Sequence, residues 1–258
     1  MSIFIIFIIF CIGLAVGSFL NVAIVRLPEG RTVRGRSACL ACSRTLTWTE
    51  LIPLVSFFIL RGKCKSCRTP ISWQYPIVEL ITGVLFIATW YFHNYSITQL
   101  PVLLRDAFFL SVLLVIFVHD LRWSIIIDRV TLPALAVTLA LQFWIAPTFA
   151  TVQSLAIGMT IGGGFFAAQY IVSRGRWIGG GDIRLGVLMG AMLGWRGTLV
   201  SLFLAYMIGA VIASILLLVR RKRFGDAIPF GTFLTVATAV SLFYGEAIIQ
   251  WYAHAFIF

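Results

Sequence analysis

The sequence predicts an all-α, polytopic membrane protein, a helix bundle of about eight spans with a zinc-ribbon-like loop on the cytoplasmic side. Of its 258 residues, 60% are hydrophobic and only 11% are charged, and the mean hydropathy is +1.01. These values are far from those of an average water-soluble domain. Apolar runs of about 20 residues, the length that crosses a hydrocarbon core of roughly 30 Å, recur along the chain. The composition therefore favours helices packed in lipid.

The apolar runs define eight expected spans, at residues 2–24, 77–93, 102–119, 130–148, 151–173, 183–195, 198–219 and 228–252. The first is expected to be a span and not a signal peptide, because basic residues follow it rather than precede it. The sixth has only about 13 residues and would reach about 20 Å as a helix. It is either a tilted short span or a re-entrant segment. We expect three parts: the span 1–24, a polar loop at 25–76, and a membrane-embedded domain at 77–258.

The basic residues give the orientation. The formal net charge is +11, with 20 Lys and Arg residues. If the eight spans alternate in direction and both termini lie outside, 18 of these 20 residues fall in the cytoplasmic connectors, among them Arg221, Lys222 and Arg223. The positive-inside rule predicts this bias. The basic excess is therefore a signal of topology, and we expect no nucleic-acid partner.

Four cysteines in the polar loop have the spacing of a metal site. Cys39 and Cys42 form one C-x-x-C pair, and Cys64 and Cys67 form a second pair after 21 residues. Two such pairs can close a tetrahedral zinc site. The expected orientation places the loop in the reducing cytoplasm, where disulfides are rare. Structural Zn²⁺ is the favoured interpretation, with redox chemistry or unligated thiols as alternatives.

Between the two cysteine pairs lies a short apolar segment, residues 51–60, which is too short to cross the membrane. We expect it to lie against the membrane surface or against the bundle, and Trp48 and Trp73 suit an interfacial position. Two acidic residues of the same loop, Glu29 and Glu50, are expected to be solvated surface charges.

Two aspartates lie at the cytoplasmic boundary of the membrane. Asp120 ends an unbroken apolar run, and Asp182 follows a run of three glycines and begins the sixth span. Carboxylates beside hydrocarbon are costly and usually mark function. If the two converge they can share one proton, so that one activates water while the other polarises a peptide carbonyl. The pair therefore indicates aspartic-protease chemistry.

Other residues are expected to support this site. Gly179, Gly180 and Gly181 would let an extended substrate approach the backbone closely, although the run taken alone is better explained as a plain flexible turn. Asp128 is expected to be a turn or cap residue that supports the site. Glu79, at the cytoplasmic end of the second span, could recognise a substrate amine or pair with an arginine of the loop.

At this point the sequence resembles the type IV prepilin peptidases, membrane aspartic proteases of the GxGD kind. The resemblance runs over almost the whole chain and rests on the order and spacing of several motifs. In chain order these are residues 17–22 (GSFLNV) and 26–28 (RLP), the two C-x-x-C pairs, 71–79 (ISWQYPIVE), 120–133, 179–185 (GGGDIRL) and 228–231 (IPFG). The chain departs from the family's usual pattern at Arg122, Ile127 and Arg184.

The resemblance implies that Asp120 and Asp182 are the catalytic pair. It further implies an enzyme of the bacterial inner (cytoplasmic) membrane that removes the basic leader from prepilins or pseudopilins at the cytoplasmic face. Many members also methylate the new N-terminus with S-adenosylmethionine, a cofactor that enters the expectation through the resemblance alone.

Two other classes of function fit part of the pattern. In an ion-coupled transporter, Asp120 and Asp182 would relay ions, but they are expected at the membrane boundary and not at the midplane. In an inactive pilus or secretion assembly factor, the cysteine loop would serve for docking. Cleavage of a prepilin by the unmodified chain, and not by its Asn variants, would separate the peptidase from both.

Overall fold

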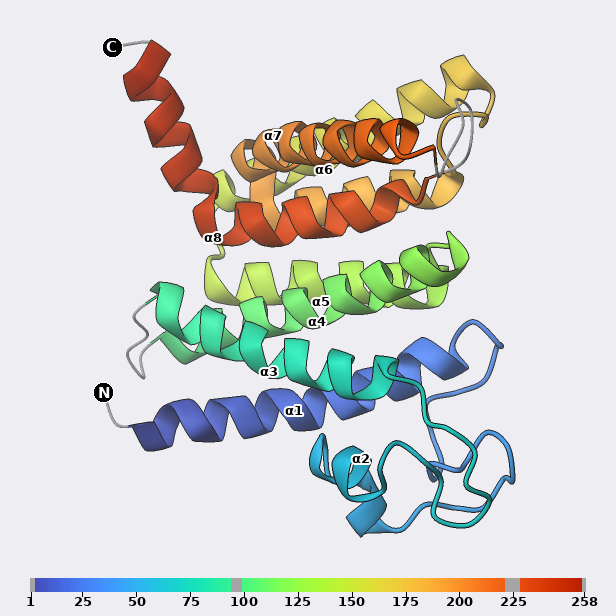
Figure 1. Ribbon diagram of the computed structural model, residues 1–258. Coiled ribbons are helices and arrows are strands. Elements are labelled where there is room, and N and C mark those ends of the chain that lie inside the picture. Colours follow the sequence, from blue (N-terminus) through green and yellow to red (C-terminus); the bar gives the residue numbers. More distant parts are fainter. Residues whose placement is uncertain (1–2, 94–98, 221–227, 257–258) are drawn as a thin grey trace. The chain divides into compact units, whose positions relative to one another are not determined.

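A computed structural model describes residues 3–93, 99–220 and 228–256, and it confirms the all-α class (Figure 1). In the described residues, extended pairing is limited to two isolated bridges in the loop after the first helix. The helices, in chain order, are α1 (Ile3–Arg26), the 3₁₀ helix η1 (Trp48–Leu51), α2 (Val55–Ile59), α3 (Gln74–His93), α4 (Leu100–Trp123), α5 (Asp128–Ile145), α6 (Phe149–Ser173), α7 (Gly180–Leu218) and α8 (Phe230–Phe256).

Six of the described helices are long and apolar enough to cross a membrane: α1, α3, α4, α6, α7 and α8. The expected span at 130–148 corresponds to the shorter α5, and the expected spans at 183–195 and 198–219 both fall within the 39-residue α7. The expectation of about eight spans is therefore consistent with the helices observed. Arg221, Lys222 and Arg223 lie outside the described residues.

The chain forms two compact units, Met1–Val115 and Ile116–Phe258, whose boundary falls inside α4. The first unit holds the cysteine loop, and the second holds both Asp120 and Asp182. The functional division into residues 1–24, 25–76 and 77–258 remains a prediction.

In the first unit, α1 and α3 pack closely along a line of glycines. A Cβ atom at Gly13 would lie 2.7 Å from the Cα of Gly83, and one at Gly17 would lie 2.7 Å from the Cα of Glu79. Small residues allow such backbone approach between membrane helices. Near the same end, the buried Asn21 donates to the carbonyl oxygen of Tyr75 at 3.1 Å. Two of the motifs that carry the resemblance thus meet in space.

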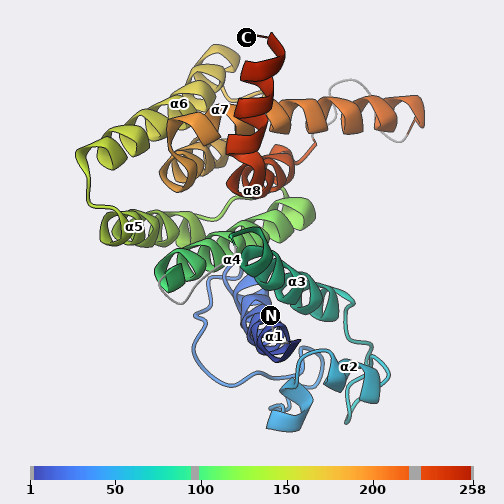
Figure 2. The same ribbon diagram turned by 90° about the vertical axis from the view of Figure 1, so that its left-hand side faces the viewer.

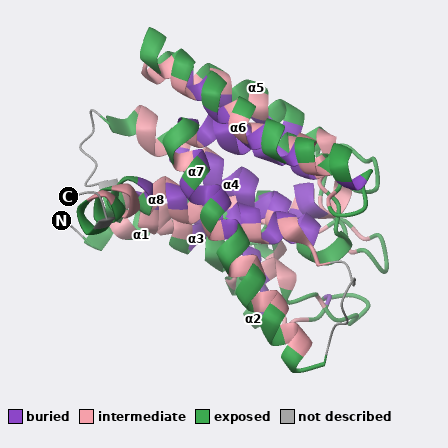
Figure 3. Cartoon of the chain, turned by 90° about the horizontal axis from the view of Figure 1, so that it is seen from above, coloured by how far each residue is buried: buried purple, intermediate pink, exposed green. Residues whose placement is uncertain are grey.

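In the second unit, α6 and α7 pack through glycines that the sequence places inside apolar segments. A Cβ atom at Gly162 would overlap the carbonyl oxygen of Gly186, and one at Gly158 would lie 2.7 Å from the carbonyl carbon of Gly194. Figure 3 shows buried residues gathered along α4 and α7. Gly158 and Gly162 of α6 therefore serve helix packing, as expected for a membrane bundle.

Helix α7 bends sharply at Gly194, whose φ of 66° and ψ of −178° are not helical. Only glycine adopts this conformation readily. The bend leaves carbonyl groups of the preceding turn without their helical donors, and the side-chain amide of Gln142 on α5 donates to two of them, those of Ala191 at 3.2 Å and Met192 at 2.9 Å. The bend explains why one helix corresponds to two expected spans.

Replacing Gly162 by Ala is expected to lower the thermal stability of the protein in detergent. The added methyl group would force α6 away from the Gly186 carbonyl, and overpacking of this kind typically costs about 1–3 kcal/mol. The matched control is Gly164→Ala, two residues further on, where a Cβ atom meets nothing within 4 Å. An equal Tm for the two variants would contradict this account of the packing.

Candidate active site and metal site

Asp120 lies in the last turn of α4 and is buried, with 4% of its surface exposed. Its Oδ2 atom accepts a hydrogen bond of 2.7 Å from the backbone N–H of Thr232, in the first turn of α8. Gly231 precedes this residue, and a Cβ atom there would lie 2.9 Å from the same oxygen. The first turn of α8 can approach the carboxyl group because residue 231 has no side chain. The N-terminal end of a helix also favours negative charge.

Asp182 lies in the first turn of α7 and is also buried, at 8% exposure. Its Oδ2 atom accepts a hydrogen bond of 2.9 Å from the backbone N–H of Gly179, which precedes the helix. The carboxyl group therefore caps its own helix and fixes the turn made by the glycine run. A Cβ atom at Gly180 would meet nothing within 4 Å, so the backbone is open there.

Ile126, in the connection between α4 and α5, lies between the two aspartates. A Cβ atom at Gly181 would lie 2.8 Å from the Cβ of Ile126, and a Cβ atom at Gly231 would lie 3.2 Å from its Cδ1. The Ile126 side chain thus contacts Gly231, which precedes the Thr232 that donates to Asp120, and Gly181, which precedes Asp182. These contacts bring together two residues that are 62 positions apart in the sequence.

An aromatic cluster adjoins the aspartates and consists of Phe165, Phe166, Tyr206, Phe230 and Phe233. The ring of Tyr206 lies 5.0 Å from that of Phe230 and 5.6 Å from that of Phe165. The Tyr206 hydroxyl donates to Gln169 at 2.9 Å. Tyr206 follows Asp182 by 24 positions, which a straight helix would hold about 36 Å apart, yet its ring contacts Phe230, which adjoins the Gly231 that packs against Asp120. The bend at Gly194 therefore turns the second half of α7 back toward the site.

Asp128 and Glu79 have different surroundings. Asp128 begins α5 and forms an ion pair with Arg184 of α7, and both side chains are about half exposed. Glu79 lies in the first unit, where its buried carboxyl group accepts a hydrogen bond of 2.8 Å from the backbone N–H of Leu54. A backbone amide of the loop is thus one bonding partner of Glu79, and the Ser18 side chain is another.

The four loop cysteines gather into one cluster. Their Sγ atoms all lie within 4.8 Å of one another, and those of Cys39 and Cys67 are 3.8 Å apart. Four sulfurs that each lie about 2.3 Å from a zinc ion would be about 3.8 Å apart at the corners of a tetrahedron. The cluster therefore fits a zinc ion with only a small contraction.

The two C-x-x-C pairs are built alike. In each turn the fifth residue donates its backbone N–H to the carbonyl of the first cysteine, Ser43 to Cys39 at 2.9 Å and Arg68 to Cys64 at 3.0 Å. Both donors have a left-handed backbone, with φ of 55° and 59°. Short bridges close the two turns, one between Ala38 and Thr45 and the other between Lys63 and Pro70. Each of the two turns therefore presents two sulfurs to the same cluster.

Hydrogen bonds to the sulfurs favour thiolates at some positions. The hydroxyl and backbone N–H of Thr69 lower the pKa of Cys67 to about 6, and the backbone N–H groups of Cys67 and Ser66 lower that of Cys64. At Cys42 the backbone N–H of Arg44 acts in the same direction, but burial and the three nearby sulfurs outweigh it and raise the pKa to about 11. Crowded thiolates need a cation, which a zinc ion would supply.

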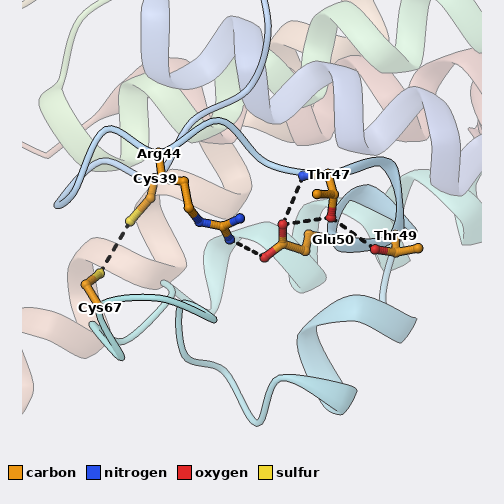
Figure 4. A network of polar contacts seen from close by, with 6 residues as sticks. All are labelled: Cys39, Arg44, Thr47, Thr49, Glu50 and Cys67. Carbon is orange, nitrogen blue, oxygen red and sulfur yellow. Dashed lines mark hydrogen bonds and ion pairs between the residues drawn. The ribbon is translucent and has the colours of Figure 1, made fainter.

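Glu50 joins the cysteine cluster to the short helices that follow it, as Figure 4 shows. Its carboxylate pairs with Arg44 and accepts from the backbone N–H of Thr47 at 2.9 Å and its hydroxyl at 2.8 Å. The Thr47 N–H, the Arg44 guanidinium and the Thr47 hydroxyl hold the pKa of Glu50 at about 2. The expectation of a solvated charge was wrong for Glu50, whose side chain is 6% exposed. The same expectation is met by Glu29, whose side chain is half exposed beside Arg31.

The comparisons with known proteins agree with this geometry. Residues 11–93 match the model of the Bacterial Peptidase A24 N-terminal domain, and residues 107–214 match that of the Type IV leader peptidase family. A Prepilin leader peptidase/N-methyltransferase of Bacillus subtilis is 33% identical over 246 residues, which cover 95% of this chain and 96% of that protein. The chain belongs to the type IV leader peptidase family.

Two further relatives carry the same name. The protein of Aeromonas hydrophila is 31% identical, and the alignment covers 96% of this chain and 94% of that protein. The protein of Legionella pneumophila is 32% identical, and the alignment covers 93% of this chain and 91% of that protein. No solved structure matches the chain significantly. As a member of this family with six described helices able to cross a membrane, the chain is a multi-pass protein of the bacterial inner membrane.

Several residues near the aspartates were not among the expected site residues. Thr232, Ile126, Tyr206 and Gln169 act through a backbone amide, packing or a bend in α7, and none carries a local sequence signal for such a role. Ile126 and Gly231 fell within motifs of the resemblance, residues 120–133 and 228–231, but neither was singled out.

Proposed function

We propose that this chain is a membrane aspartic endopeptidase that cleaves the basic leader of type IV prepilins or pseudopilins at the cytoplasmic membrane face. The observation that supports the proposal is the burial of Asp120 and Asp182 in one unit, where Gly181 beside Asp182 and Gly231 beside Asp120 both pack on Ile126. The family names of the relatives agree with it.

In the proposed mechanism, the two carboxyl groups act as a pair that shares one proton. Each accepts one backbone N–H on its Oδ2 atom, from Thr232 and from Gly179, so each has a second oxygen to offer to water or substrate. The ionised member takes a proton from water, and the resulting hydroxide adds to the scissile carbonyl carbon. The protonated member donates a hydrogen bond to the carbonyl oxygen. When the tetrahedral intermediate breaks down, a proton passes to the leaving amine.

The surroundings suit the proposed substrate, a basic leader followed by an apolar helix. Gly179, Gly180 and Gly181 would leave room for an extended segment, and the aromatic cluster would contact apolar side chains. Asp128 would hold the start of α5 against α7 through Arg184. Membrane lipid is the other proposed partner. The basic residues are assigned to topology and lipid headgroups, and no nucleic-acid partner is proposed.

Zinc is the proposed ligand of Cys39, Cys42, Cys64 and Cys67. Because four sulfurs fill a tetrahedral site, the ion would have no open position for water. Its proposed role is therefore to hold the loop in shape. Glu79 is proposed to fix the same loop to α3 through the N–H of Leu54.

N-methylation of the new N-terminus is proposed as a second activity, since the relatives are named for it. The methyl donor would be S-adenosylmethionine. Gly158, Gly162 and Gly163 of α6 pack against α7 and so do not form a nucleotide-binding loop. None of the contacts described above defines a site for this cofactor.

Replacing Gly231 by Ala is expected to lower kcat for leader cleavage, by about 10²-fold if Asp120 shifts by about 1 Å. A methyl group there would lie 2.9 Å from the Asp120 oxygen and would displace it. The control is Gly164→Ala, which meets nothing within 4 Å. Single-turnover cleavage in vesicles measures the effect. An unchanged kcat for Gly231→Ala would contradict the claim that close approach of residue 231 positions the Asp120 carboxyl group for catalysis.

The direct test of the function uses the purified chain in lipid vesicles and a model prepilin that carries a basic leader, a glycine and an apolar helix. Cleavage after the glycine, seen as a mass shift of the leader and of the mature protein, is the expected result. Ion flux through the same vesicles without any cleavage would instead support a transporter.

A further inference from the structure

An apolar ridge runs along the loop of the first unit and consists of Trp48, Leu51, Ile52, Val55, Phe58 and Ile59. All six side chains are exposed, and Trp48, Phe58 and Ile59 keep 77%, 63% and 74% of their surface. The ridge belongs to η1, α2 and the turn between them, and Figure 3 shows α2 largely in the colours of exposed and intermediate residues. A soluble loop would rarely leave so continuous an apolar surface uncovered.

The ridge faces outward because the opposite side of α2 is anchored. Phe57 is buried, its ring lies 5.0 Å from that of Trp73, and a Cβ atom at Gly62 would lie 3.1 Å from it. On a helix, positions 55, 58 and 59 share one face, which is the side away from Phe57. The orientation of the ridge is therefore fixed by packing.

The start of α2 is also fixed to the membrane helices. Leu54 has a left-handed φ of 59° in a tight turn closed by a 2.6 Å hydrogen bond from Val55 N–H to the carbonyl of Pro53. Such a turn is strained. It is held by the bond from its own N–H to Glu79 at 2.8 Å, and Glu79 packs against Gly17 of α1.

The hydrogen bond between Leu54 and Glu79 places the start of the ridge helix α2 relative to the end of α3. Glu79 is the sixth residue of α3, which begins at Gln74, so it lies about 7.5 Å along the helix axis from that end. Figures 1 and 2 both show α2 below α1 and α3, and the bond from Leu54 to Glu79 ties its start to α3. Interfacial helices bury their apolar face about 5–10 Å into the headgroup and acyl boundary. The ridge thus lies at the level of the bilayer edge.

The charges around the ridge suit the same partner. Arg61, Lys63, Lys65 and Arg68 follow α2 directly, while the one acid within the ridge segment, Glu50, is paired with Arg44. Anionic headgroups of the cytoplasmic leaflet attract such basic segments. Trp48, at the edge of the ridge, is a residue type typical of the membrane interface.

We propose that the ridge inserts into the cytoplasmic leaflet of the bilayer, so that η1 and α2 form an interfacial anchor which holds the cysteine loop against the membrane. The partner is lipid, through apolar contact with acyl chains and charge contact with anionic headgroups. The proposal does not depend on the reaction that the chain catalyses.

The test places an environment-sensitive fluorescent amino acid at position 59 by codon suppression, which avoids labelling the cysteines. The matched control carries it at position 40, because Leu40 is apolar and 69% exposed but lies in the first cysteine turn. Both proteins are reconstituted in phosphatidylcholine–phosphatidylglycerol vesicles with ordinary or brominated acyl chains. Brominated lipid should quench the fluorophore at position 59 and not at position 40, and iodide in the buffer should do the reverse.

Equal iodide quenching at both positions, with no effect of brominated lipid, would overturn the proposal. So would shielding of position 59 that depends on protein density and not on brominated lipid, because that result would assign the ridge to a contact between two copies of the chain. Far-UV circular dichroism and zinc content should match between the two labelled proteins.

Discussion

Replacing either Asp120 or Asp182 by Asn is expected to reduce leader cleavage on the order of 10³-fold, within the range that positioned acid–base groups contribute. Asn has nearly the same shape and can still accept the backbone N–H of Thr232 or Gly179 that each carboxyl group accepts now. It cannot take a proton from water or give one to a carbonyl. The loss should therefore appear in kcat, while the binding of a prepilin changes little.

The control for these variants is Glu29→Gln, which removes a carboxylate that is half exposed and paired with Arg31 in the loop. Its rate should equal that of the unmodified chain. A Tm in detergent close to the original for both Asn variants would show that the lost rate is not lost folding. Retention of substantial cleavage by one variant would assign that aspartate a structural role.

Removal of zinc is expected to have the second large effect, on the structure of the loop. The four sulfurs need a cation to stay together, and binding of zinc at such sites contributes about 10–16 kcal/mol in isolated zinc-finger peptides. Cys64→Ser should therefore lose bound zinc and expose residues 27–73 to proteases. Metal content by mass spectrometry, expected to be one zinc per chain before substitution, and limited proteolysis measure the two outcomes.

Cys11→Ser provides the control, because Cys11 lies in α1, apart from the metal cluster. It should retain one zinc and full resistance of the loop. If the unmodified protein is purified without metal and its loop resists proteolysis equally well, the structural role of zinc is contradicted. Loss of zinc should also release the ridge, since Arg44 and Glu50 connect the cysteine turns to η1.

The sequence predicts most of the architecture, because hydropathy and the distribution of basic residues depend on the membrane and not on detailed packing. The cysteine cluster was predictable for a related reason, since metal ligation imposes a short and regular spacing. Asp120 and Asp182 could be selected as a pair from their position at one membrane face. In each of these cases a physical constraint acts directly on residue type.

The sequence could not provide the contacts that bring the site together. The bend of α7 occurs at Gly194, but the same apolar run contains several other glycines, so the sequence does not indicate which of them bends the helix. Gln142, which supports the bend, lies on another helix. Thr232 contributes only a backbone N–H to Asp120, so its side chain carries no signal. Glu50 looked like a solvated loop charge because its partners, Arg44 and the Thr47 backbone, depend on the turn formed by the first cysteine pair.

The measurement that tests the central claim most directly is the single-turnover cleavage rate of four proteins: the unmodified chain, Asp120→Asn, Asp182→Asn and the double variant, each in vesicles with excess enzyme over a model prepilin. If the carboxyl groups share one proton and act as a unit, either single substitution should remove nearly all of the rate, and the double substitution should remove little more. If the two losses instead multiply, or if either single variant cleaves at the original rate, the aspartates act separately and the shared-proton mechanism is contradicted.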